Sequence, residues 1–577
     1  MKNYFNYIKL LALALIVGIM SSCTKKADEL ERIPKEARIV LAMDAGSLHD
    51  KGNFEEVTDL KMYKFLEKEM KSESSDMADM FEDAINDYKV TGLNARGEMF
   101  WFMVNENSDE EYFGFVFDML DQDDFEKYIK DFFKEIGEEV TIEEKENYRY
   151  WSPDDDAWFG WNGTSLVLLG TEDYSSRKQL GDHLDDIFEM GKDKSILEVK
   201  DFNNFYNARK DVSFWMSYAL LSDMGMDDVP GMGNMGGMGN MMDLDFDDLY
   251  LHAYLNFEKD MIVMEGKMSP KEVVDEQFDE YKFFRNGVDD KVLSYLPEKA
   301  YMAAGFAMVP TEYYKWIKSI FPIAAMESGV KEEMGFGITE AVEAIGGDFV
   351  FSISGFDMKE VEYTEWNQEW NPEKFSNYNY KTGKYEYTGG YDYVEVQGTK
   401  EVLLPDMAMV ASINNSEIFD KFAELLEKSM GEDDYEKFGD IYKIEADNMN
   451  IFFSWNDEVM MIATDLELIE DALDKELDKT LAGTDIGKSL TSNASYFYFD
   501  LNMEDYPGEV ENYIKEEMGG DEFYVFSNIM ETFNMMSMAS DVNNYSFTMK
   551  VKTKDTGENS LYTLIKLIDD NLPFDDM

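Results

Sequence analysis

The sequence predicts an α+β protein made of two homologous units, each with an antiparallel sheet and packed helices. Short apolar runs of strand length alternate with amphipathic helical patterns in the order β-α-β-β-β-α. Adjacent hairpins of this kind are typical of α+β architecture and argue against a doubly wound parallel sheet. The same order occurs twice along the chain, so the sequence also predicts a tandem duplication.

Matches between the two halves set the predicted boundaries at 33–290 for unit one and 294–577 for unit two. The longest match runs without a gap for about 45 residues at an offset of 294, and it aligns Trp161 with Trp455. Two further matches lie outside it: Ile33 to Ala37 with Leu296 to Ala300 at an offset of 263, and Asp211 to Phe214 with Asn493 to Tyr496 at an offset of 282.

Within each predicted unit, a short apolar strand leads into an amphipathic helix. The first strand and helix lie at 112–117 and 123–136, and their counterparts lie at 407–413 and 416–430. Three further strands and a second helix follow in each unit. These strands are expected at 148–152, 157–162 and 165–170 in unit one, and at 439–445, 449–455 and 459–464 in unit two.

The pairs Asn162-Gly163 and Asn456-Asp457 lie between the last two of these strands in each unit. Asn-Gly and Asn-Asp pairs suit two-residue hairpin loops, in which both central residues have positive φ. The sequence therefore predicts tight hairpins at both positions.

The composition describes folded protein with a strongly acidic surface. The 577 residues include 121 acidic and 53 basic side chains, a net charge of −68, yet 44% of the residues are hydrophobic and 15% are aromatic. A disordered acidic tail is poor in aromatic residues. The charge argues against a nucleic-acid partner, because such binding depends on Lys and Arg that neutralise phosphates. Clustered carboxylates leave nonspecific association with divalent cations open.

Residues 1–22 predict a lipoprotein signal peptide. Lys2 and Lys9 precede the apolar stretch Leu10 to Met20, which is too short to span a bilayer. The small residues before Cys23 resemble the lipobox of bacterial lipoproteins. That resemblance implies diacylglycerol transfer to the Cys23 sulfur, cleavage before Cys23 and acylation of the new amino terminus, for example with palmitate. Residues 23–32 then form a lipidated tether to the membrane.

Cys23 is the only cysteine in the chain, so no intramolecular disulfide, zinc cluster or catalytic thiol is expected. An ordinary signal peptide followed by an incidental cysteine is the alternative. Thr24, rather than Asp, follows the cysteine, and by resemblance to bacterial lipoprotein sorting this favours the outer membrane. Both the periplasmic and the outer face of that membrane stay open.

Two strand-like segments carry a family resemblance. The first, Ile33 to Met43, comes shortly after the lipobox, and the second runs from Tyr254 to Met264. Together they resemble the Bacteroidetes lipoproteins that contain domain of unknown function 4836. The resemblance covers nearly the whole mature chain and implies compartment and architecture. It implies no activity and no catalytic residues.

The segment 357–400 interrupts unit two, where unit one has almost nothing between Glu106 and Glu111. Aromatic residues at a spacing of two around glycine turns predict a small antiparallel meander with its tyrosines on a shared face. Exposed rings suit stacking on a glycan or anchoring of an envelope protein, whereas the alternative is that this face packs on the unit beneath it. The candidate recognition residues are Trp366, Trp370, Tyr378, Tyr380, Tyr385, Tyr387, Tyr391 and Tyr393.

A Gly/Met-rich loop at 223–243 places a methionine at every third residue: Met232, Met235, Met238 and Met241. Thioethers are soft ligands that suit Cu(I), which makes these residues candidate copper ligands. The alternative is an adaptable loop, because methionine is a common apolar residue in this chain, with 41 in total.

The sequence predicts no enzyme and no cofactor. The three histidines, His49, His183 and His252, show no metal-ligand spacing, and we expect them in surface or incidental positions. Gly483 to Ser489 departs from a phosphate-binding loop because three residues, rather than four, separate its glycines. The predicted function is a non-enzymatic, lipid-anchored cell-envelope protein with a binding or structural role. Recognition of a glycan or protein through segment 357–400, and copper handling by the Met loop, are the alternatives.

Overall fold

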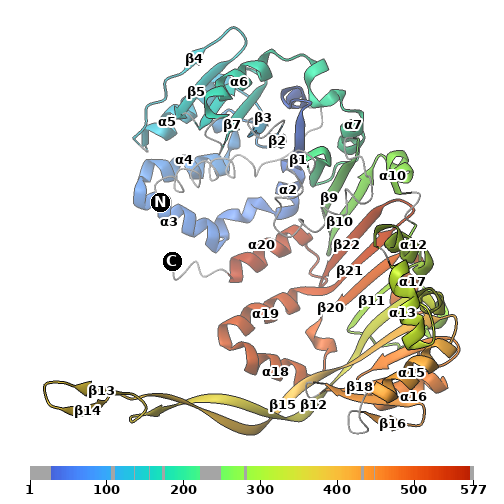
Figure 1. Ribbon diagram of the computed structural model, residues 1–577. Coiled ribbons are helices and arrows are strands. Elements are labelled where there is room, and N and C mark those ends of the chain that lie inside the picture. The colour runs from blue at the N-terminus through green and yellow to red at the C-terminus, as the bar shows by residue number, and fades with distance from the viewer. Residues whose placement is uncertain are drawn as a thin grey trace.

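One antiparallel sheet of twenty strands runs through the described part of the protein in the computed structural model (Figure 1). The structure describes residues 28–105, 111–135, 137–154, 156–171, 176–220, 248–278, 282–321, 323–429, 435–446 and 449–571. The predicted signal peptide, Cys23 and the Met loop 223–243 lie outside these residues. Within them, no helix is both long enough and apolar enough to cross a membrane.

The first half of the sheet has the strand order β4-β5-β6-β7-β3-β2-β1-β8-β9-β10, in which all neighbours are antiparallel. Its strands are β1 (Ala37–Asp44), β2 (Glu98–Asn105), β3 (Glu111–Asp118), β4 (Glu143–Glu144), β5 (Arg149–Asp154), β6 (Ala157–Trp161), β7 (Ser165–Gly170), β8 (Val212–Ser217), β9 (Tyr250–Glu258) and β10 (Met261–Ser269).

The second half continues from β10 in the order β22-β21-β20-β11-β12-β15-β19-β18-β17-β16. Its strands are β11 (Met302–Ala307), β12 (Ile345–Asn371), β15 (Gly390–Ile413), β16 (Glu436–Phe438), β17 (Ile441–Ala446), β18 (Met449–Trp455), β19 (Val459–Ala463), β20 (Ser495–Asp500), β21 (Phe533–Asp541) and β22 (Ser546–Thr553).

The two halves have the same topology, read outward from their junction. The junction is the antiparallel pair β10–β22, in which Met264 lies opposite Met549. The register also reproduces the offset of 294, because Gly114 pairs with Leu169 in the first half and Ala408 pairs with Ala463 in the second. The predicted fold class is confirmed, although the halves share one sheet. That both halves descend from one ancestral unit stays a prediction.

One sequence match is wrong by a single residue. The Asp44 amide donates to the Asp211 carbonyl at 2.9 Å, and the Ala307 amide donates to the Ala494 carbonyl at 3.0 Å. Asp44 and Ala307 are related by the offset of 263, so the counterpart of Asp211 is Ala494 rather than Asn493. A shift by one residue moves every side chain to the opposite face of a sheet, and this correction is used below.

The predicted helices and strands around the longest match are confirmed, but the turn chemistry differs from the prediction. No residue of Asn162-Gly163 or Asn456-Asp457 has positive φ in the described chain. Instead, the Asn162 side-chain oxygen accepts hydrogen bonds from the amides of Thr164 and Ser165. Asn456 does the same for the amides two and three residues ahead of it. The asparagine side chain therefore forms the turn.

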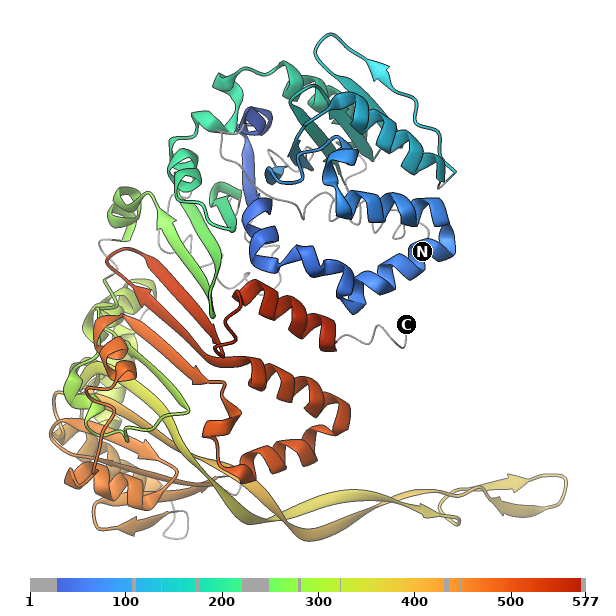
Figure 2. The ribbon, with the colours of Figure 1, turned by 180° about the vertical axis from the view of Figure 1, so that it is seen from behind.

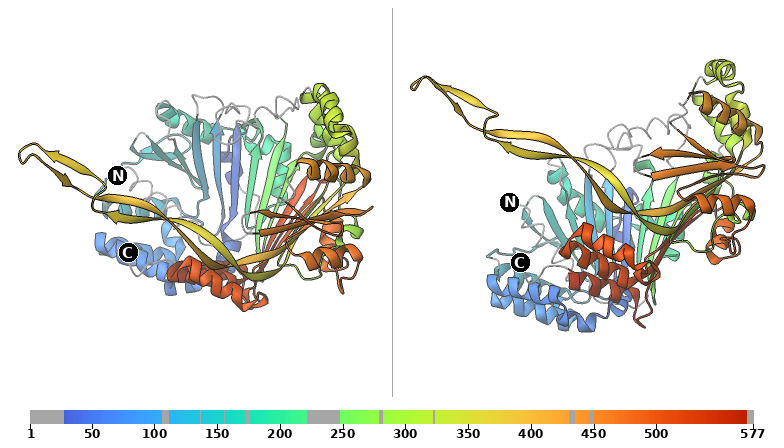
Figure 3. Two further views of the ribbon diagram at one scale, coloured as in Figure 1. Left: turned by 60° about the horizontal axis from the view of Figure 1, so that its bottom comes forward. Right: turned by 90° about the horizontal axis from the view of Figure 1, so that it is seen from below.

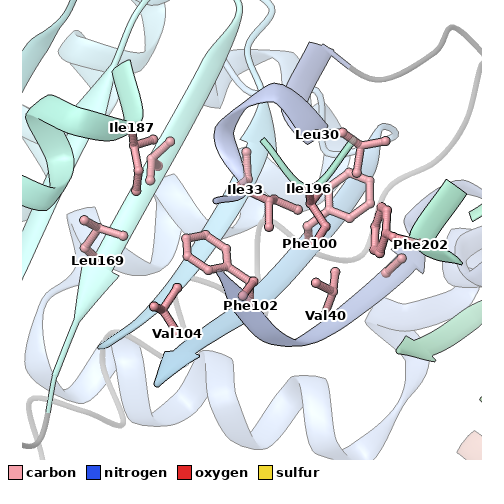
Figure 4. Packing of buried hydrophobic residues seen from close by; sticks show 14 of the residues in the cluster. Leu30, Ile33, Val40, Phe100, Phe102, Val104, Leu169, Ile187, Ile196 and Phe202 are labelled. Atoms are coloured by element: carbon pink, nitrogen blue, oxygen red, sulfur yellow. The ribbon is translucent and has the colours of Figure 1, made fainter. Parts of the chain in front are cut away.

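Helices cover both faces of the sheet. In the first half, α6 (Leu180–Glu189) and α7 (Lys200–Asn207) cover one face, and α5 (Gln122–Glu135) covers the other. In the second half, α16 (Leu466–Asp474) and α17 (Asp485–Ser492) correspond to α6 and α7, and α15 (Glu417–Ser429) corresponds to α5. Figure 4 shows the largest core cluster, where Phe100 and Phe102 of β2 pack beneath Ile196 and Phe202.

Further helices extend these layers. They are α2 (Ala45–Gly52), α3 (Lys61–Glu73), α4 (Ser75–Asn86), α10 (Lys271–Phe278), α11 (Asp290–Leu293), α12 (Pro310–Ile320), α13 (Ala324–Met334), α14 (Ile338–Ala344), α18 (Gly508–Met518), α19 (Gly520–Thr532) and α20 (Ser560–Asn571).

The C-terminal helix α20 belongs in space to the first half. The Asp569 carboxylate of α20 accepts the amides of Lys61 and Met62 at 2.9 and 2.7 Å, so it caps the first turn of α3. The Tyr562 hydroxyl also donates to Glu56 at 2.7 Å. These contacts place the C-terminal helix beside α2 and α3 of the first half (Figure 1).

Candidate recognition surface on the β12–β15 arm

The strands β12 and β15 are far longer than any other pair and leave the body of the protein as a two-stranded ribbon (Figures 2 and 3). They pair continuously from Asp357 opposite Leu404 to Asn371 opposite Gly390. We call residues 357–404 the arm. The short strands β13 (Ser376–Asn379) and β14 (Lys384–Tyr387) form its tip. The predicted meander is wrong, because a spacing of two does not distinguish several short strands from one long hairpin.

An aromatic cluster holds the base of the arm on the second half. The ring of Phe356, just before the arm, lies 5.2 Å from Tyr301 and 5.7 Å from Tyr506 between centroids. Tyr301 and Tyr506 lie 4.4 Å apart. Beside this cluster, burial and the nearby carboxylates of Asp357 and Asp465 raise the pKa of Asp406 above its usual range.

Beyond the base, one face of the arm carries four exposed aromatic rings. Trp370 lies opposite Tyr391, and Tyr393 lies opposite Gln368, two residues nearer the base. Directly opposed residues of an antiparallel pair share a face, and Trp366 lies on the same side by its spacing. We call Trp366, Trp370, Tyr391 and Tyr393 the aromatic face. Their exposed fractions are 62%, 56%, 52% and 62%, respectively.

Contacts within the aromatic face order these rings. Trp370 and Tyr391 meet edge to face at 5.2 Å between centroids. The Gln368 amide donates to the Tyr393 hydroxyl at 3.0 Å. Gly389 has a φ of +73°, and a Cβ there would lie 2.1 Å from the Trp370 ring. A glycine is therefore required where the chain returns beneath this tryptophan.

The opposite face of the arm carries apolar residues among charged ones such as Glu365 and Glu369. It carries Val361, Tyr363, Val394 and Val396, of which the last two are exposed. Between Asp357 and Leu404, β12 and β15 pair with no other strand of the described chain, so both edges of the ribbon offer free backbone donors and acceptors. The arm thus presents apolar side chains on two faces and hydrogen-bonding groups on two edges.

The tip carries a separate aromatic cluster. Tyr378 and Tyr385 lie opposite each other with ring centroids 5.1 Å apart, and Tyr380 is 91% exposed. The charged residues of segment 374–391 are three lysines and a single acid, Glu386, in a chain that is otherwise strongly acidic. The Asn379 side chain donates to Glu386 at 2.6 Å. The tip is therefore locally positive.

The structure brings together some of the predicted recognition residues and separates others. Trp366, Trp370, Tyr391 and Tyr393 form the aromatic face, whereas Tyr378, Tyr380 and Tyr385 belong to the tip. The backbone of Tyr387 pairs with Ser376 in the tip hairpin. The prediction of one shared tyrosine face is wrong, because residues 372–375 interrupt the ladder between arm and tip. The alternative that these rings pack on the body is also wrong, because they are exposed.

The other predicted candidates do not form a site that the structure describes. Cys23 and the candidate copper ligands Met232, Met235, Met238 and Met241 lie outside the described residues. Among the described residues, no three His, Cys, Asp or Glu side chains are arranged to hold a metal ion.

The expectation of surface histidines is wrong for His49, which is buried, and for His252, whose side chain is fully buried. Its Nε2 lies 2.6 Å from the Asp201 carboxylate of α7. The same carboxylate accepts hydrogen bonds from Trp215 Nε1 at 3.1 Å and from Ser269 Oγ at 2.6 Å. We call these four residues the Asp201 cluster. His252 and Tyr254 alternate with Ala253 along β9, so both rings lie on the same buried face of the strand. This alternation was the sequence signal for the burial of His252.

Opposing effects set the pKa of Asp201. Burial alone would raise it, but the hydrogen bonds from His252, Ser269 and Trp215 outweigh burial and hold the pKa below its usual range. Because both the carboxylate and the imidazole are buried, the cluster has no open position for a substrate. Its role is to hold α7 on the sheet.

The fold and the arm define a large α+β protein with one continuous antiparallel sheet and a protruding aromatic hairpin. No curated protein and no solved structure is significantly similar to the chain. The chain belongs to the family described as a domain of unknown function, DUF4836, whose model matches residues 31–561. The family predicted from sequence is therefore confirmed, whereas lipidation of Cys23 and a Bacteroidetes origin stay predictions.

Proposed function

We propose that this protein is a non-catalytic, lipid-anchored component of the outer membrane that binds a partner protein through its arm. The observation that carries the proposal is the exposure of four aromatic rings on one face of a ribbon that projects away from the body. Large exposed apolar patches are typical of interaction sites, and Trp and Tyr are enriched among the residues that dominate binding energy.

Both faces of the arm favour a protein over a glycan. A sugar ring stacks on one aromatic face and leaves the other face without a role, whereas Val394 and Val396 are exposed on the opposite side. A protein partner can bury both faces and also pair with the free edges of β12 or β15. An isolated two-stranded hairpin is only marginally stable in water, so a partner would also stabilise the ribbon.

A lipid on Cys23 would hold the start of the first half close to the membrane. Only four residues separate Cys23 from Asp28, where the described chain begins, and that length spans at most about 18 Å when fully extended. Several acyl chains on Cys23 would make attachment effectively permanent, since each buried methylene contributes about 0.8 kcal/mol. A partner of the arm would then be another component of the same envelope.

The double substitution Trp366→Ala and Trp370→Ala tests recognition by the arm. We expect it to remove the partner from the complex that the tagged full-length protein forms when it is crosslinked in cells and extracted in detergent. Phe321→Ala is the matched control, because Phe321 is 55% exposed but lies outside the arm. Its complex should equal that of the unmodified protein.

A separate binding assay tests the glycan alternative. Retention of the purified protein on polysaccharide from the same cells, lost in the double tryptophan variant, would overturn the protein proposal and establish glycan recognition. An unchanged crosslinked complex in the double variant would also overturn it.

The anchor is tested separately by Cys23→Ala. Without the acceptor sulfur no diacylglycerol can be attached, so we expect the protein to move from the membrane pellet to the soluble fraction. The measurement is an immunoblot of membrane and soluble fractions after a high-salt wash. A variant that still sediments quantitatively with membranes would contradict lipid anchoring.

A further inference from the structure

The second half contains a cavity at the position where the first half contains the Asp201 cluster. The cavity has a volume of about 630 Å³ and lies between α17 and the strands β20, β21 and β22. Its volume falls within the range of small-molecule sites. The residues used in the argument below are Tyr496, Tyr498, Asp500, Ser537, Lys550 and Lys552, all of which line it.

Strand register establishes the correspondence on the sheet. Trp215 lies opposite Val40 in the first half, and Tyr498 lies opposite Ala303 in the second. Val40 and Ala303 are related by the offset of 263, so Tyr498 is the counterpart of Trp215. On the next strands, His252 lies opposite Trp215 and Ser537 lies opposite Tyr498. Serine therefore stands where the first half has the buried histidine.

The helix above the sheet differs in the same way. The Ile196 amide donates to the Ile33 carbonyl, and the Leu481 amide donates to the Leu296 carbonyl, both at 2.8 Å. Five residues further along, Asp201 in α7 corresponds to Ile486 in α17. The second half thus lacks both the carboxylate and the imidazole that fill this space in the first half, and on the sheet Ser537 and Tyr498 are smaller than the histidine and tryptophan to which they correspond.

The polar groups of the cavity are available to a ligand. Lys550 and Lys552 alternate on β22 and therefore lie on the same face, and both are exposed. Neither makes an ion pair with the part of the chain that the structure describes, although acidic residues outnumber basic ones more than twofold. Asp485, Asp500 and Asp505 also line the cavity, but they lie on α17, on β20 and just after β20, so the side formed by β22 is the one that suits an anion.

The opposite wall supplies rings and hydroxyl-binding groups. Burial, with a contribution from Asp500, raises the pKa of the Tyr498 phenol to about 12, so its hydroxyl remains a donor at neutral pH. Burial, supported by the nearby Asp505, also raises the pKa of Asp500. Tyr496 contributes a second ring and Ser537 a hydroxyl. Rings beside carboxyl and hydroxyl groups suit the C–H faces and hydroxyls of a sugar.

We propose that this cavity binds an acidic saccharide, with Lys550 and Lys552 on its carboxylate and the tyrosine wall against its ring. The equivalent space between helix and sheet then has a different role in each half. In the first half the Asp201 cluster fills it, and in the second half it stays open for a ligand. This site is independent of the arm, which lies on other strands.

Calorimetry on the full-length protein in detergent micelles tests the proposal, with glucuronate, glucose and inorganic phosphate as probes. We expect glucuronate to bind and glucose to bind at least tenfold more weakly. We also expect the double variant Lys550→Gln, Lys552→Gln to lose at least tenfold in affinity for glucuronate. Lys267→Gln is the matched control, because Lys267 lies opposite His252 as Lys550 lies opposite Ser537 but does not line the cavity.

Three outcomes would overturn the proposal. The first is the absence of glucuronate binding, and the second is binding that the double variant leaves unchanged. The third is inorganic phosphate binding as tightly as glucuronate, which would identify a simple anion site rather than a saccharide site. Tyr498→Phe provides an additional test that preserves the fold, since it removes only the donor hydroxyl and should weaken glucuronate binding about fivefold, the effect of one neutral hydrogen bond to the sugar.

Discussion

Replacing Asp201 by alanine is expected to lower the free energy of unfolding by about 3–5 kcal/mol, because removal of the buried carboxylate leaves three buried hydrogen-bonding groups without their partner. His252, Trp215 and Ser269 would each lose their acceptor inside a site from which water is excluded. The measurement is urea unfolding at pH 7, followed by tryptophan fluorescence.

The pH dependence of this loss follows from the lowered pKa of Asp201. A carboxyl group whose pKa is lower in the folded protein contributes stability above its unfolded pKa, near 3.9, and loses it as the pH falls through the folded pKa. The difference between the unmodified protein and Asp201→Asn should therefore be largest at neutral pH and should shrink on acidification below about pH 4.

The matched control is Asp485→Ala in α17, the second-half counterpart of α7. Asp485 is exposed and pairs only with Lys488 at 2.8 Å, so its removal should leave the unfolding midpoint unchanged. An Asp201→Ala protein as stable as the unmodified one would contradict the structural role of the cluster.

Replacing Trp161 by alanine is expected to lower the free energy of unfolding by about 3–5 kcal/mol, the usual cost of truncating a buried tryptophan. Trp161 is fully buried, lies 5.3 Å from Phe125 between ring centroids, and donates to Glu126 at 3.1 Å. Arg149 donates to the same carboxylate at 2.6 Å, so the substitution would leave a cavity beside a hydrogen-bonded ion pair.

Trp455 provides the comparison inside the same chain. It occupies the position of Trp161 in the second half and donates to Asp420 at 2.9 Å, but it is only partly buried. Trp455→Ala should therefore cost less than Trp161→Ala in the same urea titration. An equal loss of stability in both variants would contradict the claim that the deeper burial of Trp161 makes it contribute more than Trp455.

Local patterns predicted much of the fold. The amphipathic period around Phe125 and Phe419 placed α5 and α15, and apolar runs placed the hairpin strands near Trp161 and Trp455. These predictions succeeded because helices and hairpins depend on residues close in sequence. The pairing of β10 with β22 escaped prediction, since Gly266 and Phe547 meet across 281 residues and nothing local specifies that register.

The candidate surface was predicted in composition but not in geometry. The aromatic spacing of segment 357–400 predicted strands. The length of the ribbon, however, depends on unbroken pairing from Asp357 opposite Leu404 to Asn371 opposite Gly390. Exposure of Trp366 also had no sequence signal, because a buried and an exposed aromatic strand share the same period. The Asp201 cluster and the cavity beside Lys550 escaped for a related reason: both combine residues from separate strands and a helix.

Site-specific photocrosslinking from the arm in living cells tests the central claim most directly. A photoreactive phenylalanine would replace Trp370 on the aromatic face, and the control would carry it at the exposed Phe321. Arm-mediated recognition predicts one discrete protein adduct from position 370, absent from position 321 and lost when Trp366→Ala is added. The same adduct from both positions, or none from the arm, would contradict it.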